Sequence, residues 1–256
     1  MSAVRYLSED DKDYRDRLTE ITQLDSSHTP SLHTQMIDLF YKHIVDWAFS
    51  HTVGHGRSNR RDVLATVVCL QTPLSMEGIA SLLHLDIRDI QFALSPLHSV
   101  IYVPEDGHVN IFHASFREFI INTERFLENR VEYSKAHEML AVKCLQFLNM
   151  SLHRNICGLP EGRIGTLPHD IRDSSIISEA LRYCSLQWAS HLQGALSSPG
   201  DTVPSTVLHP LSTFADEHMV HWFECLSAVG ELESGIRSLR KAKEAILVST
   251  PRDEEF

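Results

Sequence analysis

The fold is decided by residues 100–120, which read VIYVPEDGHVNIFHASFREFI. Apolar and polar side chains alternate over 100–103 and again over 109–112, and this alternation predicts two half-buried strands. Pro104, Asp106 and Gly107 favour a turn between the two strands. From Phe112 onward the apolar residues recur every three or four positions, which is the spacing of one helix face. The stretch therefore predicts a β-hairpin followed by a helix that begins near His113.

Three short helices are predicted upstream of this hairpin. The apolar run within Arg61–Leu70 indicates a mostly buried first helix, which Pro73 ends because proline disfavours a helical residue before it. Ser75 is a suitable N-cap for a second helix, and Asp86 is one for a third. Three helices, a hairpin and a further helix are the elements of a winged-helix domain, which we place at residues 60–123.

The charge of this predicted domain bears on DNA binding, the commonest role of winged helices. Residues 61–121 hold seven acidic and three basic side chains, a net charge of −4. Lysine and arginine contacts to phosphate supply most of the attraction to a duplex, so this domain has the wrong sign for that role. We therefore assign no nucleic-acid-binding residues, and we keep a winged-helix nucleic-acid-binding regulator as the alternative function.

The remainder of the chain is predicted to be helical. Residues 1–57 form a polar N-terminal segment with a linker helix, whose apolar face lies within Leu32–Phe49, and His51–Asn59 has the composition of a linker. Residues 132–248 form an α-helical domain, because apolar stripes recur there at helical spacing. Trp188, Leu192, Trp222 and Phe223 are expected to be buried between these helices. The fold class is mainly α: a winged-helix domain with a β-hairpin wing, followed by an α-helical array.

The composition is that of a cytoplasmic protein. The chain has 256 residues and a net charge of −11, and it contains neither a run of about 20 apolar residues nor an apolar signal peptide. Its five cysteines are widely spaced and never form CxxC, so we expect buried, reduced thiols. No membrane partner is predicted.

Four motifs, in order, carry a family resemblance. HASFREF at 113–119 follows LHSV at 97–100, LHRNIC lies at 152–157, YCSLQWASHL at 183–192 and HWFECLS at 221–227. Together they resemble the region that follows the NTPase core in fungal NACHT-type STAND NTPases, which are NLR-like proteins. LFYKHI at 39–44 is similar to the helix just after that core.

The resemblance implies a non-catalytic role for this chain. The family's phosphate-binding GxxxxGK[ST] loop and its acidic Walker B strand are absent from the sequence, and residues 1–57 are too short to hold such a core. We therefore expect a regulatory and oligomerisation module that couples nucleotide state to assembly, without ATPase activity or a cofactor. Its implied partners are proteins, either a NACHT core or repeat domains in cis or in trans. We do not expect the isolated chain to bind nucleotide.

One residue is a candidate site by resemblance alone. His113 occupies the place of the family's MHD histidine, which contacts the nucleotide's β-phosphate, although Ala114 replaces the motif's aspartate. We therefore expect nucleotide sensing by His113 only in an intact parent protein.

Other chemistry finds no support in the sequence. His51 and His55 are four residues apart, and His218 and His221 share a helix face, but neither pair belongs to a zinc motif. Ser115 lies near His113 without a GxSxG elbow, so a hydrolase is not predicted. We assign no catalytic residue and no metal ligand.

Overall fold

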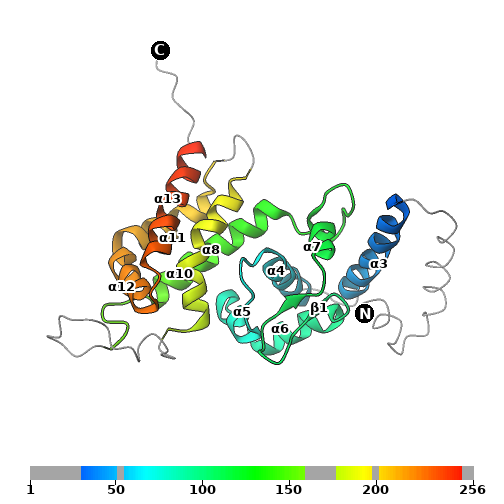
Figure 1. The fold of residues 1–256 in the computed structure, drawn as a ribbon, viewed down its shortest axis with the longest axis horizontal. Helices are drawn as coiled ribbons and strands as arrows, with labels where there is room; N and C mark the ends of the chain where they lie inside the picture. The colour runs from blue at the N-terminus through cyan, green and yellow to red at the C-terminus, as the bar shows by residue number, and fades with distance from the viewer. Residues whose placement is uncertain (1–29, 51–54, 159–176, 198–201, 250–256) are drawn as a thin grey trace, which may run out of the picture. The chain divides into compact units, whose positions relative to one another are not determined.

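The computed structural model describes residues 30–50, 55–158, 177–197 and 202–249, and these are mainly helical (Figure 1). They belong to two compact units. The first takes the described residues up to Ala80 and Leu85–Glu132, and the second takes Ser81–His84 and the described residues from Tyr133 onward. None of the described helices has both the length and the apolar character needed to cross a membrane.

The first unit has the predicted order of elements. It contains α3 (Pro30–Ser50), α4 (His55–Cys69), the start of α5 (Met76–Leu83), α6 (Ile87–Leu94), η1 (Ser95–Leu97), β1 (Ile101–Tyr102), β2 (Asn110–Ile111) and α7 (Ala114–Ile121). Asp86 caps α6, as predicted, by accepting the Arg88 N–H at 2.8 Å.

The first helix of this series begins earlier than its sequence pattern indicates. α4 starts at His55 rather than at Arg61, so the expectation of a linker over 51–59 is wrong for 55–59, while 51–54 lie outside the described residues. Tertiary contacts explain the longer helix. The Arg57 guanidinium donates to Asn129 Oδ1 at 3.3 Å, and that of Arg60 donates to the Phe92 carbonyl at 3.0 Å.

The hairpin is shorter than predicted but has a definite register. Ile101 pairs with Ile111 and Tyr102 with Asn110, in antiparallel orientation. The turn closes through a bond from Gly107 N–H to the Pro104 carbonyl at 3.0 Å, and Gly107 adopts a φ of 79°, a conformation that favours glycine.

A third segment joins the hairpin on the β2 side. Ser75 forms an antiparallel bridge with His108, and the Val109 N–H donates to the Leu74 carbonyl at 2.8 Å. β2 therefore lies between this segment and β1, and β1 is the outer strand.

α3 belongs to the core of the first unit. Tyr41 is 6 % exposed, and its ring contacts Phe116 (5.2 Å between centroids) and Phe119 (5.6 Å), both of which are fully buried on α7. α3 also packs against η1. This packing brings the side chains of α3 up to the beginning of α7.

The second unit contains helices and no strand in its described part. It contains α8 (Tyr133–Ser151), α10 (Glu179–Ala195), α11 (Ser205–Thr213), η2 (Phe214–His218), α12 (Met219–Val229) and α13 (Leu232–Ser249), and α10 packs against α8, α12 and α13. Two of the predicted apolar stripes are confirmed, because their members are all buried: His137, Leu140, Ala141, Cys144, Leu145 and Leu148 on α8, and Ile177, Leu181, Cys184, Trp188 and Leu192 at or along α10. The stripe predicted over 214–229 is confirmed only in part, because Phe214, Trp222 and Leu226 are buried while Met219, Phe223 and Val229 are half-buried. All five cysteines of the chain are free and buried.

An aromatic cluster occupies the centre of this unit. The Trp222 ring lies edge-on to Trp188 (6.2 Å between centroids) and to Phe214 (5.6 Å), and its Nε1–H donates to the Ser185 carbonyl at 3.0 Å. The predicted burial of Trp188, Leu192 and Trp222 is confirmed, whereas Phe223 is only half-buried. Pro210 lies inside α11 without ending it, and the helix departs from α geometry only afterwards, in the π-helical turn η2.

The last helix turns its smallest side chains inward. Gly235, Ser238, Ala242 and Ala245 are buried, while Leu232 and Ile236 remain 43 % and 47 % exposed. A Cβ on Gly235 would lie 2.2 Å from Leu226 Cδ1, so α13 approaches α12 too closely for large residues at this position. The sequence predicts a different inner face, an apolar line of Leu232, Ile236, Leu239 and Ile246, and this prediction is wrong because none of the four is fully buried.

Candidate functional site

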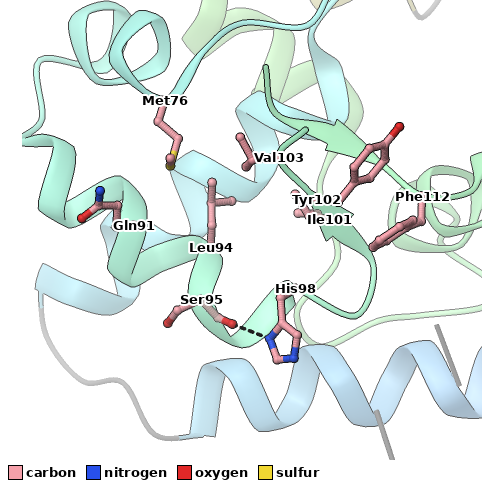
Figure 2. Close-up of a pocket in the computed structure, with 9 residues that line it drawn as sticks. All are labelled: Met76, Gln91, Leu94, Ser95, His98, Ile101, Tyr102, Val103 and Phe112. Carbon is pink, nitrogen blue, oxygen red and sulfur yellow. Dashed lines mark hydrogen bonds between the residues drawn. The ribbon is translucent and has the colours of Figure 1, made fainter. Parts of the chain in front are cut away.

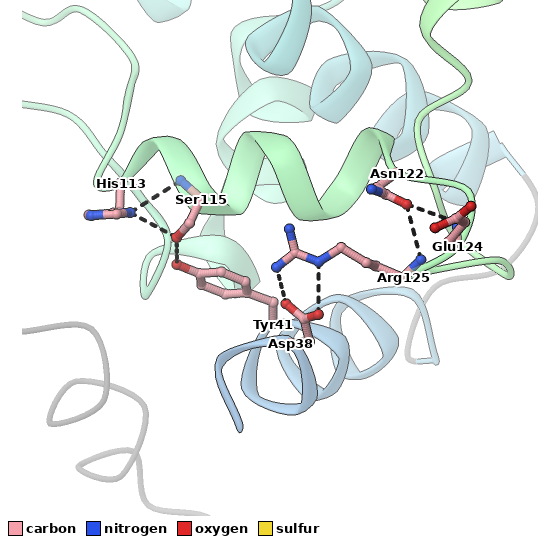
Figure 3. A network of polar contacts seen from close by, with 7 residues as sticks. All are labelled: Asp38, Tyr41, His113, Ser115, Asn122, Glu124 and Arg125. Carbon is pink, nitrogen blue, oxygen red and sulfur yellow. Dashed lines mark hydrogen bonds and ion pairs between the residues drawn. The ribbon is translucent and has the colours of Figure 1, made fainter. Parts of the chain in front are cut away.

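His113 caps the N-terminus of α7 with its ring. Its backbone is extended (φ −146°, ψ 137°), and Nδ1 accepts the Ser115 N–H at 3.1 Å (Figure 3). Ser115 Oγ lies 2.8 Å from the same Nδ1. A ring nitrogen that accepts a backbone N–H carries no proton, so the Ser115 hydroxyl must donate to it. The neutral ring therefore carries its proton on Nε2.

This assignment fixes a directed chain of hydrogen bonds. The Tyr41 hydroxyl lies 2.8 Å from Ser115 Oγ. Because Ser115 donates its only proton to His113, Tyr41 must donate to Ser115. The chain from Tyr41 through Ser115 to His113 links the buried interior of α3 to an exposed imidazole.

An ion pair joins α3 to the turn that follows α7. The Arg125 guanidinium donates to both carboxylate oxygens of Asp38, with Nε 2.8 Å from Oδ2 (Figure 3). This hydrogen bonding raises the pKa of Arg125. Asn122 Oδ1 accepts the N–H groups of Glu124 (2.8 Å) and Arg125 (3.2 Å), which shapes the turn that presents the guanidinium. Asp38 and Tyr41 are one helical turn apart, so α3 holds both ends of α7.

The geometry at His113 differs from that of a hydrolytic triad. In a triad, the imidazole takes the serine proton at one nitrogen while a carboxylate holds the other nitrogen. Here one nitrogen faces both Ser115 and the helix backbone, and no carboxylate of the described residues bonds the other. The chemical property that the arrangement offers is one oriented imidazole N–H at an exposed position.

A second feature of the first unit is a cleft of about 380 Å³ between α6, η1 and β1 (Figure 2). Its apolar lining is Met76, Leu94, Ile101, Val103 and Phe112. The polar lining is Gln91, Ser95, His98 and Tyr102. The His98 ring is oriented by Nδ1–H, which donates to the Ser95 carbonyl at 2.7 Å, and the Tyr102 ring stacks on Phe112 at 4.4 Å.

The surface of α6 and the hairpin is acidic and partly apolar. Asp86 and Arg88 are exposed at the start of α6, and Glu105 and Asp106 are exposed at the hairpin tip. Phe92 is 55 % exposed on α6, and the Arg60 guanidinium lies 4.9 Å from its ring centroid. A duplex-binding surface needs exposed lysine and arginine side chains, so this face is a poor match for DNA.

The His218–His221 pair has no third potential metal ligand beside it among the described residues. The rings of His218 and His221 lie 6.1 Å apart, and no group of three or more potential ligands occurs among the described residues. His51 lies outside those residues, and so does the side chain of His55.

Sequence reasoning missed a buried imidazole pair in the second unit. His137 and His191 are fully buried, and their Nδ1 atoms lie 3.0 Å apart. The Tyr183 hydroxyl lies 2.7 Å from His191 Nε2. Burial and the neighbouring His137 lower the pKa of His191 to about 3, so its ring is neutral at physiological pH. A Cβ on Gly194 would lie 2.5 Å from His137 Nδ1, and glycine at this position therefore leaves the space that the ring occupies.

Of the residues singled out in the sequence, the structure brings together His113 and Ser115 and adds Tyr41 to them. Tyr41 lies within the LFYKHI motif, which gave a signal for the helix but none for this contact. The Asp38–Arg125 pair had no sequence signal, since 87 positions separate its members. No known family model, curated protein or solved structure matches this chain.

Proposed function

We propose that this chain is a non-catalytic regulatory module of the kind that follows the NTPase core in fungal NACHT-type STAND proteins. In this proposal residues 60–123 form a winged-helix domain and residues 132–248 a helical domain. The order of helices and strands from α4 to α7, and the third segment paired to the hairpin at Ser75, support the winged helix.

The orientation of His113 carries the proposal. Nδ1 of His113 accepts both the backbone N–H and the hydroxyl of Ser115. The other ring nitrogen, Nε2, therefore carries the proton, and its N–H is available at an exposed position. A fixed N–H donor suits the oxygen of a phosphate. The donor is rigidly supported, because Tyr41 and the Asp38–Arg125 pair hold α3 against α7. In an intact parent, this N–H would contact the nucleotide held by the NTPase core and report its presence to the helical domain.

The chain alone should bind nucleotide and duplex DNA poorly. One imidazole N–H is far short of the backbone cradle, lysine and magnesium ligands that hold a triphosphate. Calorimetry with ADP, with ATP and magnesium, and with a generic duplex at low salt should therefore give no measurable heat of binding. Salt-sensitive duplex binding would instead support the nucleic-acid-binding regulator.

The positive test supplies the core in trans. A recombinant NACHT NTPase core from a fungal STAND protein is loaded with a fluorescent ADP analogue, and nucleotide release is measured with and without this chain. We expect the wild-type chain to slow the release. His113→Asp should lose this effect, because aspartate still caps a helix but repels phosphate. His108→Ala, which removes another imidazole of the same unit, is the matched control and should act as wild type.

Two results would contradict the proposal. Equal slowing by wild type and His113→Asp would remove His113 from the nucleotide contact. An unchanged release rate at every concentration of the wild-type chain would remove the coupling role itself.

A further inference from the structure

α13 keeps its large apolar side chains on the outside of the second unit. The residues that this helix buries are small: Gly235, Ser238, Ala242 and Ala245. Leu232, Ile236 and Leu247 are instead 43 %, 47 % and 61 % exposed. A surface helix of a globular protein normally turns its apolar stripe toward the core. The inverted arrangement of α13 is typical of a helix whose apolar side meets another molecule.

The exposed apolar residues of α13 form one stripe, which we call the outer face. Its members follow one another at three or four positions along the helix: Leu232, Ile236, Leu239, Lys243 and Leu247. Side chains at this spacing lie one above the other on the same side of a helix. Leu239 is half-buried and Lys243 is exposed. The outer face is therefore aliphatic except for one ammonium group.

The outer face points away from α10. The Ser238 hydroxyl donates to the Leu186 carbonyl at 3.4 Å, and the Lys241 ammonium donates to Ser190 Oγ at 3.0 Å. Ser238 and Lys241 therefore mark the side of α13 that faces α10. At about 100° per residue, every residue of the outer face lies a quarter-turn or more around the helix from both positions.

The charges of α13 are unevenly placed around the outer face. The outer-face residues before position 240 are all aliphatic, whereas Lys243 lies within the face and Arg240, three positions before it, borders the face. The two carboxylates of α13 lie outside the stripe and are exposed: Glu233, which accepts from Arg237 at 2.7 Å, and Glu244. An occupant of the outer face should therefore be apolar along one half and carry carboxylates along the other.

α12, which packs against α13, places no carboxylate toward the outer face. Its one acidic residue is Glu224, whose carboxylate accepts the Asn155 N–H at 3.1 Å. Gly235 of α13 approaches α12 at Leu226 and Trp222. Residues two positions apart lie on nearly opposite sides of a helix, so Glu224 points away from α13.

We propose that the outer face of α13 binds an amphipathic helix of a partner protein, antiparallel to α13 and with carboxylates in its N-terminal half. Apolar residues of the partner at helical spacing would pack on Leu232, Ile236 and Leu239, as in other cases of helix recognition. The antiparallel orientation brings the partner's carboxylates opposite Arg240 and Lys243. It also puts them at the positive end of the partner helix's own dipole. This role is independent of any contact between His113 and a nucleotide.

Two other occupants fit these charges less well. A second copy of this chain would bring the same two cations, Arg240 and Lys243, and no carboxylate within its outer face. An anionic membrane would meet exposed Glu233 and Glu244 on the polar side of α13, where membrane-surface helices carry mainly lysine and arginine.

The probe for the outer face is the fluorescein-labelled peptide LAQAEQAELAQLAQALAQ, with both ends blocked. Its leucines and first glutamate repeat the spacing of the outer face in reverse order. Fluorescence anisotropy at low salt should show saturable binding to the full chain, with a Kd of about 100 µM or tighter. The same peptide with lysine in place of both glutamates should bind at least about fivefold more weakly, in line with the size of exposed charge interactions.

Variants of the chain test the apolar contact and the charge separately. Ile236→Asp should abolish binding and leave the thermal unfolding temperature almost unchanged, because the side chain is half exposed. Leu208→Asp changes an apolar residue of α11 that is 51 % exposed, and this matched control should bind as wild type. Lys243→Glu should reverse the preference, so that the lysine peptide binds more tightly than the glutamate peptide. Arg154→Glu, at an exposed position of the same unit, should leave the preference unchanged.

Four outcomes would overturn the proposal. One is the absence of saturable binding of the glutamate peptide, and another is full binding by the stably folded Ile236→Asp variant. The third is the same ratio of affinities for the two peptides in wild type and Lys243→Glu, which would remove the charge recognition. The fourth is another occupant of the outer face. It would be shown if Ile236→Asp turned a dimer into a monomer in analytical ultracentrifugation, or abolished sedimentation with phosphatidylserine vesicles.

Discussion

His113 in the first unit and His191 in the second are the same side chain in opposite surroundings. His113 lies at an exposed position and accepts two bonds at Nδ1 from its own helix. His191 is fully buried between Tyr183 and His137, and burial holds its pKa at about 3. The first imidazole presents a hydrogen-bond donor to the outside, whereas the second is a neutral part of the core.

The difference extends to how the two units respond to acid. Large buried rings occur in both cores, Phe116 and Phe119 in the first unit and Trp188 and Trp222 in the second. Only the second unit has a buried imidazole pair, because none of the described histidine side chains of the first unit is buried. Changes in protonation should therefore affect the second unit most, and changes to caps should affect both units modestly.

The largest effect should come from Trp222→Ala. Truncating a fully buried aromatic side chain typically costs about 3–5 kcal/mol, and here it also removes the bond to Ser185. Hydrogen exchange read helix by helix should show the loss in α10 and α12. The control is Phe223→Ala, which truncates the half-buried neighbour and should cost clearly less. A loss below about 1 kcal/mol for Trp222→Ala would mean that the aromatic cluster does not organise this unit.

The next largest effect should come from acid. An unfolded histidine titrates near pH 6.5, whereas folded His191 stays neutral down to about pH 3. Between these values the unfolded state binds the extra proton, so the free energy of unfolding falls as the pH is lowered from 6.5. The contribution of His191 between pH 6.5 and pH 5 is a loss of about 1.6 kcal/mol.

The variant that isolates this contribution is His191→Gln, which keeps polar atoms but does not titrate. Urea unfolding of α10, followed by hydrogen exchange at several pH values, should show a smaller dependence on pH in the variant than in wild type. Identical pH dependence in the two proteins would show that His191 is accessible to protons in the folded state.

A smaller effect should come from Gly194→Ala. Overpacking a core costs about 1–3 kcal/mol, and the new Cβ would meet the His137 ring, although alanine favours helix by up to about 1 kcal/mol. We expect a net destabilisation of about 1–2 kcal/mol in chemical denaturation, together with shifted imidazole NMR signals. Gln193→Ala changes an exposed neighbour on α10 and should be nearly neutral. A stabilised Gly194→Ala protein would mean that His137 has room to move.

Local patterns predicted the elements of this molecule better than their contacts. The alternation at 100–103 and 109–112 was sufficient to predict the hairpin, because a period of two reports strands directly. Composition failed at 55–59, where glycine and serine indicate a linker but long-range contacts of Arg57 and Arg60 accompany a helix. It failed again on α13, where close packing at Gly235 selects a face by size rather than by hydropathy.

The candidate site was predictable only in part. His113 stood out through its motif, but its partner Tyr41 lies on a different helix, 74 positions from Ser115. The pairing of His137 with His191 spans 54 positions and was concealed because His137 occupies an apolar stripe. Single-sequence patterns report periodicity within an element, and these contacts depend on how elements pack.

The smallest effects should come from the helix caps, where the two units offer a matched pair. His113 caps α7, and Ser178 caps α10 by accepting the Leu181 N–H at 3.2 Å. Alanine at either position should cost about 1 kcal/mol, because one N–H group of the helix start loses its side-chain acceptor. At His113 a further substitution can separate the cap from the proposed contact with phosphate. Asp is a strong N-cap residue, so His113→Asp should recover the stability that His113→Ala loses while abolishing the effect on ADP release proposed above.

Amide exchange at Ser115 reports the cap directly. We expect slow exchange in wild type and in His113→Asp, and fast exchange in His113→Ala. This result would separate the structural role of His113 from its proposed contact with phosphate. Fast exchange in wild type itself would mean that the ring does not hold the helix start, and the fixed orientation of Nε2–H would then have no support.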